Sequence, residues 1–123
     1  MTDVEVERKY QEWAFWQESM ELVELLCDLE IACPKEGMSD IGAHLRKAAV
    51  SVPANIAEGA AKGGGYTANH LRHAKGSICE VNTLLQLVQR MNLAGDGDLE
   101  KLLELTDSIY LGLSRFIKAI PQN

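Results

Sequence analysis

The sequence predicts an all-α fold, an antiparallel up-down-up-down four-helix bundle. Apolar residues recur at steps of three and four through four long segments, a spacing typical of helices that bury one face. Three short stretches rich in Gly or Pro, at 33–40, 62–67 and 93–98, separate these segments, and no alternating run of β-branched residues lies between them. Because short links favour antiparallel neighbours, we expect one bundle domain that spans residues 1–123.

The first predicted helix, at about residues 4–32, is apolar on two sides. One stripe follows steps of three and four and consists of Trp13, Trp16, Met20, Val23, Cys27 and Ile31. A second stripe consists of Phe15, Leu22, Leu26 and Leu29. At about 100° per residue, the two stripes lie on roughly opposite sides of the helix. The core of a single bundle cannot cover both of them.

The second predicted helix, at about residues 40–61, contains a proline. Its inner face consists of Ile41, Leu45, Ala48, Val52 and Ile56, and a second face consists of Val50, Ala54, Ala57 and Ala61. Pro53 removes the hydrogen bond to the Ala49 carbonyl, which costs about 3 kcal/mol in an ordinary helix interior. Because the apolar face continues past the proline, we expect a bend, with Ser51 or a water satisfying the freed carbonyl. The alternative is a helix that breaks at Val52.

The third and fourth predicted helices, at about residues 67–93 and 98–120, have the clearest periodicity. The third turns Leu71, Ala74, Ile78, Val81, Leu85 and Val88 inward, while Leu84, Leu87 and Met91 extend its apolar surface round the side. The fourth has a stripe of Leu99, Leu102, Thr106, Ile109, Leu113, Phe116 and Ile120, which Leu103, Tyr110 and Ile117 widen. Asp98 is the expected N-cap, because its carboxylate can accept from the free amides of the first turn.

Apolar surface on a second side of three helices predicts self-association. A bundle that stayed a single copy would leave these second sides in water. We therefore expect a homo-oligomer. The alternative is a scatter of surface hydrophobic residues, which single-copy proteins also carry.

Charge and cysteine content narrow the class of protein. The formal net charge of -6 argues against a dedicated nucleic-acid binder, because neutralising phosphates needs a basic face. Residues 41–80 are the exception, since five Lys or Arg against Glu58 and Glu80 give them a net charge of +3. The three cysteines form no CxxC pair, the first residues are acidic and polar, and no apolar run reaches about 20 residues. We expect a cytoplasmic protein with reduced thiols and no membrane partner.

A line of polar residues on the second predicted helix is a candidate site. Ser51, Asn55 and Glu58 project within about 60° of one another, and His44 and Lys62 extend the line. The third helix offers three residues near its core edge, Ser77, Glu80 and Gly76, of which Gly76 would permit a close backbone approach. We interpret the set as a hydrogen-bonded polar seam between helices or subunits. A ligand or phosphate site and acid–base catalysis are the alternatives.

The basic residues of the middle of the chain are the candidate nucleic-acid contacts. They are Arg46, Lys47, Lys62, Arg72 and Lys75. Repeated around an oligomer, their charges would add, and affinity for a polyanion rises with the number of phosphates neutralised. Tyr66 is the aromatic residue nearest to them in the sequence, so stacking on bases has little support. A solvated helix face is the alternative.

Other catalytic or metal-binding patterns are weak. His70 and His73 are three residues apart, but a metal would need a third ligand, such as Glu80 or Cys79, that the sequence does not fix. Cys79 with His73 lacks an orienting group for nucleophilic catalysis. The run GAAKGGGYT departs from the GxxxxGK[ST] phosphate loop and indicates a turn. We expect no cofactor, no metal and no enzymatic activity, with a hydrolase that uses Glu58 or Glu80 as the remaining hypothesis.

Two stretches, LRKAAVSVPANIAEGAAK and LRHAKGSICEV, resemble the bacterial four-helix-bundle family of ribosomal RNA intervening-sequence proteins. The family pattern falls on Arg46, Lys47, Ala48, Ala49, Ser51, Val52, Pro53, Asn55, Ile56, Ala57, Glu58, Gly59 and Lys62, and then on Ala74, Gly76, Ser77, Ile78 and Glu80. The chain departs from it at His44, Lys47, Lys62 and His73, where the pattern has Gln, Arg, Arg and an apolar residue. Inferences that need bidentate arginines are therefore weakened.

The resemblance implies a bundle that assembles into a ring, commonly a homopentamer, with no established enzymatic activity. The accessory proteins of diversity-generating retroelements are distantly similar, and they engage RNA and a reverse transcriptase. Our first hypothesis is a non-enzymatic homo-oligomeric scaffold whose second and third helices dock another macromolecule. The alternative is an RNA- or DNA-binding protein, acting with ribosomal RNA insertions or as an accessory factor of a reverse transcriptase.

Overall fold

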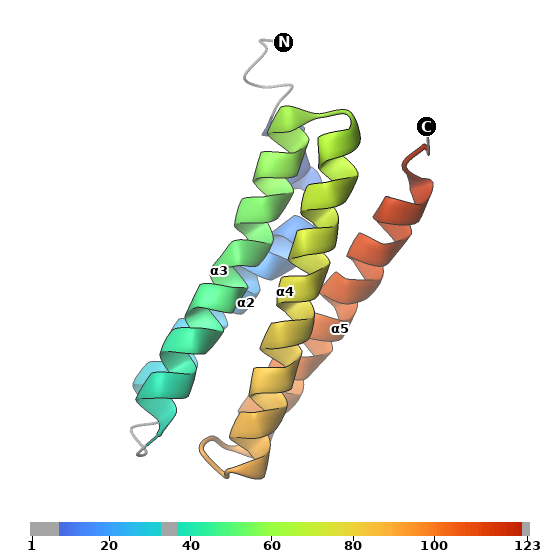
Figure 1. Ribbon diagram of the computed structural model, residues 1–123. Helices are drawn as coiled ribbons and strands as arrows, with labels where there is room; N and C mark the ends of the chain where they lie inside the picture. Colours follow the sequence, from blue (N-terminus) through green and yellow to red (C-terminus); the bar gives the residue numbers. More distant parts are fainter. Residues whose placement is uncertain (1–7, 33–36, 122–123) are drawn as a thin grey trace.

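The computed structural model describes residues 8–32 and 37–121, and the regular structure within these ranges is helical. A short 3-10 helix, η1 (Arg8–Glu12), precedes four long helices. These are α2 (Ala14–Ala32), α3 (Met38–Lys62), α4 (Gly65–Arg90) and α5 (Asp96–Ala119), which pack side by side as a bundle (Figure 1). The predicted all-α class and its four long helices are thereby confirmed.

Glycines with left-handed backbone conformations form the turn between α3 and α4. Gly63 has φ 68° and Gly64 has φ 54°, values that side chains with a Cβ rarely adopt. Thr67 closes the turn, because its hydroxyl donates to the Gly59 carbonyl at 2.8 Å. This turn lies at one end of the bundle and the turn between α4 and α5 at the other (Figure 1).

The observed helix ends differ from the predicted ones at two places. In the first segment, η1 precedes an α-helix that begins at Ala14, whereas the prediction had one helix from about residue 4. Residues 1–7, with the predicted start, and 33–36, with Cys33, lie outside the described residues. Asp98 is not the N-cap of α5, because Gly95 occupies that position and Asp98 lies in the first turn. Helix α5 therefore begins about one turn earlier than its apolar periodicity indicates.

Helix α3 continues without interruption through Pro53, so the alternative of a break at Val52 is wrong. The hydroxyl of Ser51 donates to the carbonyl of Ala48 at 2.7 Å, not to that of Ala49 as expected. One turn later the side-chain amide of Asn55 donates to the Ser51 carbonyl at 2.8 Å. Side-chain hydrogen bonds thus flank the proline on both sides. The predicted bend stays a prediction.

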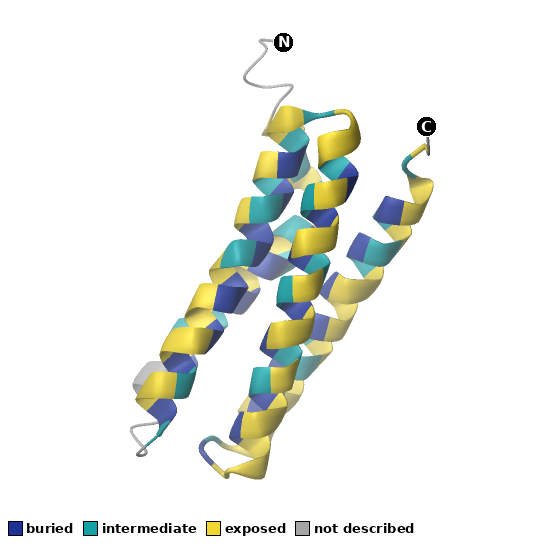
Figure 2. Ribbon diagram, in the orientation of Figure 1, coloured by how far each residue is buried: buried dark blue, intermediate teal, exposed yellow. Residues whose placement is uncertain are grey.

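The core lies along the axis of the bundle and follows the predicted inner faces closely in α4 and α5 (Figure 2). All six predicted inner residues of α4 are buried: Leu71, Ala74, Ile78, Val81, Leu85 and Val88. In α5, Leu99, Leu102, Thr106, Ile109 and Leu113 are buried, while Phe116 and Ile120 are half-buried. Tyr110 was expected to widen this core face, but its side chain is 38% exposed.

In α2 the two apolar stripes are not equivalent. Phe15, Leu22, Leu26 and Leu29 form the buried stripe. The stripe of Trp16, Met20, Val23 and Cys27 lies half-buried to exposed on the outside, with Met20 40% exposed. Bundle packing therefore uses one stripe of α2 and leaves the other at the surface.

Candidate functional site

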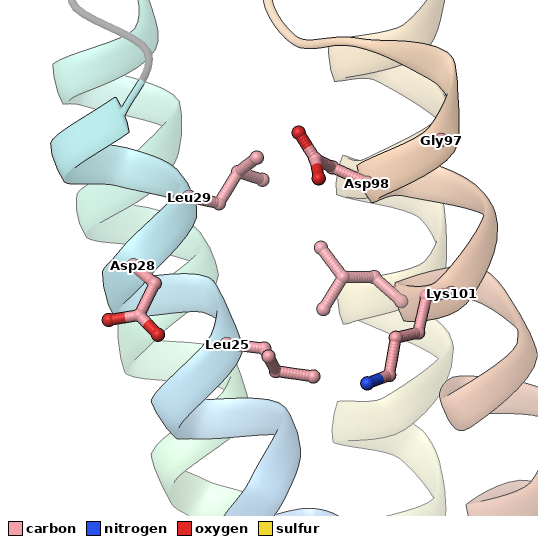
Figure 3. Close-up of a pocket in the computed structure, with 7 residues that line it drawn as sticks. Leu25, Asp28, Leu29, Gly97, Asp98 and Lys101 are labelled. Atoms are coloured by element: carbon pink, nitrogen blue, oxygen red, sulfur yellow. The ribbon is translucent and has the colours of Figure 1, made fainter.

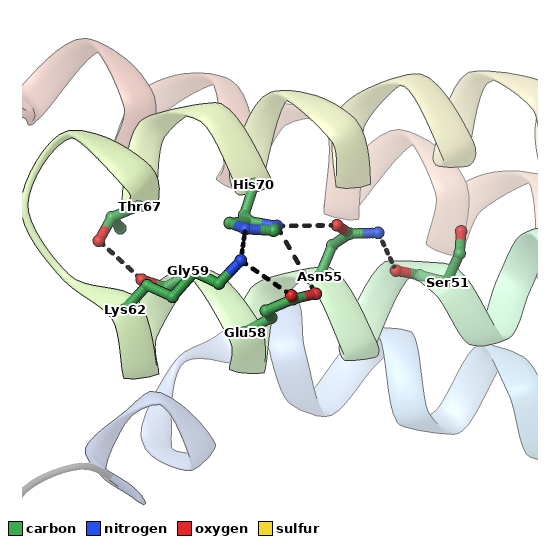
Figure 4. A network of polar contacts seen from close by, with 7 residues as sticks. All are labelled: Ser51, Asn55, Glu58, Gly59, Lys62, Thr67 and His70. Atoms are coloured by element: carbon green, nitrogen blue, oxygen red, sulfur yellow. Dashed lines mark hydrogen bonds and ion pairs between the residues drawn. The ribbon is translucent and has the colours of Figure 1, made fainter.

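A network of polar contacts joins α3 to α4 near the glycine turn, and we call it the α3–α4 seam. It consists of Ser51, Asn55, Glu58, Gly59, Lys62, Thr67 and His70 (Figure 4). The amide oxygen of Asn55 accepts from His70 Nδ1 at 3.1 Å, and Lys62 Nζ lies 3.2 Å from His70 Nε2. Because the Asn55 amide nitrogen already donates to Ser51, the neutral Nδ1–H tautomer of His70 satisfies both contacts.

The seam depends on a close approach of the two helices at Gly59. A Cβ atom at this position would lie 2.8 Å from the Cβ of His70 and 3.2 Å from the carbonyl oxygen of Thr67. Such distances leave no room for any side chain. Within the chain, no close approach occurs at Gly76, because it is exposed and a Cβ there would meet no atom of the described residues within 4 Å. A close approach by another subunit there stays a prediction. Glycine lets α3 and α4 touch at the turn end, not at the middle of α4.

Glu58 supplies the carboxylate of the seam. One of its oxygens lies 3.1 Å from Lys62 Nζ and the other lies 3.8 Å from His70 Nδ1. The hydrogen bond and the charge of Lys62 lower the pKa of the Glu58 carboxyl below its ordinary value. Glu58 is therefore a surface counter-ion, whereas a general acid would need a raised pKa.

Glu80 belongs to a second polar contact, further from the turn. His44 Nε2 donates to Glu80 Oε1 at 2.8 Å, and both side chains are about half-exposed. Lys47 and Ser51 join this pair around a hollow of about 300 Å³. Ser77, predicted in the same seam, is half-buried on α4 and takes no part in these hydrogen bonds. The predicted polar residues thus divide between two separate contacts.

The five predicted nucleic-acid contacts do not gather on one patch. Lys62 is held by Glu58, and Lys47 lies beside the His44–Glu80 pair. Lys75 lies on another side of α4, where its Nζ is 4.9 Å from the centroid of the Tyr110 ring on α5. Arg46 and Arg72 are both exposed. The contact between Lys75 and Tyr110 could not be predicted from the sequence, because 35 residues and a turn separate them.

Two further hollows between described helices lack the groups of a catalytic site. One of about 230 Å³ lies between α2 and α5, lined by Leu25, Asp28, Leu29, Gly97, Asp98, Lys101 and Leu102 (Figure 3). Its one ammonium, Lys101, lies 3.7 Å from Glu21. The exposed Cys79 lines the other, between α4 and α5, with Asn82 and Tyr110 but without His73. No group of three or more possible metal ligands occurs in the described ranges.

The seam residues that sequence reasoning missed are His70 and Thr67. His70 was considered as a metal ligand, yet it is the acceptor and donor that links Asn55 to Lys62. The tight glycine turn is the sequence feature that could have predicted the contacts of His70. Two helices that meet at Gly63 and Gly64 must place residues at similar distances on either side of the turn next to each other.

Comparisons with known proteins identify a family. A family model described as 23S rRNA-intervening sequence protein matches residues 11–115, which include both stretches of the predicted family motif. The predicted resemblance is thereby confirmed. No curated protein matches the chain. The likeness to accessory proteins of retroelements is not addressed by this match and stays a prediction. Within the described residues, every helix is too short or too polar to cross a membrane.

Proposed function

The chain belongs to the 23S rRNA-intervening sequence protein family, and from this premise we propose that it is a non-enzymatic, cytoplasmic scaffold that assembles into a ring and docks a macromolecular partner. In this proposal the subunit is an antiparallel up-down-up-down bundle and the ring has five copies. Contacts between paired helices support the helix directions. Residue numbers fall along α4 as they rise along α3, from His44–Glu80 to Asn55–His70.

The observation that carries the proposal is an apolar surface on α2 and α3 that the described chain leaves uncovered. On α2, the flank with Glu18 and Glu21 contacts Ser108 and Lys101 of α5. The stripe of Trp16, Met20 and Val23 therefore lies on the other flank, which borders α3. Adding the α3 residues of the neighbouring flank gives the α2–α3 apolar face: Trp16, Met20, Val23, Val50, Ala54 and Ala57.

The composition of this face suits a helix–helix contact between subunits. Val50 is 50% exposed and Met20 is 40% exposed, which are large values for apolar side chains. The alanines beside them give a partner helix a close approach, while Trp16 provides a large apolar area. Burying these side chains against a second copy removes apolar surface from water, which favours association.

A second apolar patch favours a ring over a two-fold dimer. Leu84, Leu87 and Met91 continue along the flank of α4 that carries Glu80, at steps of four, three and four, and we call them the α4 apolar patch. Leu87 is 42% exposed and Met91 49% exposed. A closed ring of identical subunits needs two different surfaces that bind each other, and the chain offers two.

The proposal is tested by the mass of the purified protein in solution. Light scattering should give several times 13.6 kDa, roughly five times for the expected ring. Exchanging Met20 and Val50 together for Glu should give the single-copy mass, because two carboxylates cannot be buried unpaired between subunits. Leu111→Glu is the matched control, since Leu111 is also 50% exposed but lies on α5 outside both apolar surfaces. A wild-type protein of single-copy mass would refute the scaffold.

Absence of catalysis is part of the proposal. The two carboxylates considered for hydrolysis are each engaged by a cation or an imidazole, Glu58 by Lys62 and Glu80 by His44. Exchanging both for Gln should leave partner docking and ring mass intact. A hydrolytic activity that this double variant loses while it stays folded would show an enzyme.

The second candidate function is binding of RNA or DNA, with ribosomal RNA insertions or a reverse transcriptase as the context. The exposure of cations on α3 and α4 favours it, together with the name of the matched family. Binding of a structured RNA should weaken as salt rises. Exchanging Arg46, Lys47, Arg72 and Lys75 together for Glu should abolish it. Absence of binding at low salt would exclude this function and leave the scaffold standing.

A further inference from the structure

Two helix segments that pack against each other carry cations and no carboxylate. Residues 65–79 of α4 and residues 108–120 of α5 contain no Asp or Glu, although the chain as a whole has 18. They carry Arg72 and Lys75 on α4 and Arg115 and Lys118 on α5. Arg115 follows Ser108 by two helical turns, and because Ser108 contacts Glu18 of α2, Arg115 lies on the flank of α5 that faces α2. We call the other three cations, Arg72, Lys75 and Lys118, the α4–α5 basic face.

Interhelical contacts place these three cations along the same groove. Asn82 donates to Thr106 at 2.8 Å, and further along, Lys75 lies over the ring of Tyr110 at 4.9 Å. Residue numbers therefore fall along α4 as they rise along α5. Beyond the Lys75–Tyr110 contact, Arg72 comes next on α4, while Ser114 and Lys118 follow Tyr110 at four-residue steps on the same side of α5.

The basic face is accessible. Arg72 and Lys118 are exposed and Lys75 is half-buried. The ion pairs that His44, Lys62, His70 and Lys101 form with carboxylates lie elsewhere on the described part of the bundle. Asp107 borders the basic face, in the hollow that Tyr110 also lines. A phosphate chain along α3 and α4 would instead meet Glu58 and Glu80. The α4–α5 groove is therefore the better electrostatic match for a polyanion.

Tyr110 distinguishes a nucleic acid from an acidic protein as the partner. The residue is 38% exposed, and Lys75 Nζ lies over its ring. Surfaces that bind single-stranded nucleic acid combine a positive groove with aromatic rings on which bases stack. An acidic peptide would use the cations but would gain nothing comparable from an exposed ring.

We propose that the α4–α5 basic face binds single-stranded RNA, with its three cations on the phosphodiester backbone and Tyr110 stacked on a base. The inference rests on the second function proposed above and moves its contact from α3 to α5. Three neutralised phosphates give a slope of about -2 for the logarithm of affinity against the logarithm of salt concentration. Repetition around a ring would steepen that slope.

Fluorescence anisotropy with a labelled single-stranded RNA of mixed sequence, from about 50 to 200 mM salt, tests the inference. The variant R72Q/K75Q/K118Q should lose the salt-dependent binding. The matched control K47Q/K62Q/R90Q removes as many charges from α3 and the last turn of α4 and should keep it. Tyr110→Leu should weaken binding by about tenfold and leave the salt slope unchanged, because stacking releases no counterions. Circular dichroism checks that every variant keeps its helices.

The outcomes distinguish a failure of this inference from a failure of the second candidate function, binding of RNA or DNA. Loss of binding in the control alone would overturn the inference and return the contact to α3 and α4. An equal loss of RNA binding in both variants would show that the net charge of the protein, not this face, determines binding, and would also overturn the inference. Competition by polyglutamate as strong as by unlabelled RNA would refute RNA as the partner. A wild type that binds no RNA would refute the inference together with the second function, while the mass in solution tests the scaffold separately.

Discussion

Gly59 sets the distance between α3 and α4, and its replacement gives a sharp prediction at the scale of one residue. Gly59→Ala should lower the free energy of unfolding by about 1 to 3 kcal/mol, because the new methyl group would lie 2.8 Å from the His70 Cβ. Urea denaturation followed by circular dichroism measures the change. Gly76→Ala is the control. It meets no atom within 4 Å and should be stabilising by about 0.5 to 1 kcal/mol. Equal effects of the two variants would contradict the close approach.

Glu58 and Lys62 predict a pH effect that can be read from one carboxyl group. The pKa of Glu58 is lowered in the folded protein, so its contact with Lys62 stabilises the fold above the unfolded-state pKa and is lost as pH falls through the folded-state pKa. Lys62→Met should raise the pKa of Glu58 toward its ordinary value, as an NMR titration of the side chain would measure. Lys101→Met, which frees Glu21 instead, should leave it unchanged. A Glu58 pKa that is the same in the wild type and in Lys62→Met would disprove the pairing.

At the scale of one helix, Pro53 should be replaceable with a gain in stability. An alanine would restore the amide that the Ala49 carbonyl lacks and end the ring clash, a gain of about 3 kcal/mol in an ordinary helix. Burial of the Pro53 ring offsets part of this, by about 1 to 2 kcal/mol. Pro53→Ala should therefore raise the Tm by several degrees in a calorimetric scan. A lower Tm would mean that the proline shapes α3 to fit α2 and α4.

The helices also show which features periodicity can predict. In α4 one apolar stripe runs the length of the helix and the second patch is confined to Leu84, Leu87 and Met91, so the inner residues from Leu71 to Val88 follow from spacing alone. In α2 two stripes have the same spacing, and only the positions of α3 and α5 decide that Leu22 is inside and Met20 outside. Tyr110 fits the periodic stripe of α5 but is 38% exposed, with Lys75 Nζ over its ring.

The α3–α4 seam was predictable as a set of polar residues but not as a set of bonds. Ser51, Asn55 and Glu58 stand out because helical spacing aligns them on an otherwise apolar segment. Their partner His70 lies 15 residues beyond Asn55, so finding it required the geometry of the glycine turn. Gly59 and Gly76 look alike in sequence, and packing alone separates the one that touches a neighbour from the one that does not.

For the whole molecule, the ring proposal predicts how two defective variants behave when mixed. In a head-to-tail ring the α2–α3 apolar face of one subunit binds the α4 apolar patch of the next. M20E/V50E destroys the first surface and L87E/M91E destroys the second, so light scattering should find each variant alone as a single copy. A mixture retains one intact pair of surfaces and should therefore give a 1:1 dimer of roughly twice 13.6 kDa that grows no further. If instead one self-complementary surface joined the subunits, as in a two-fold dimer, one of the two variants would associate on its own and mixing would add nothing.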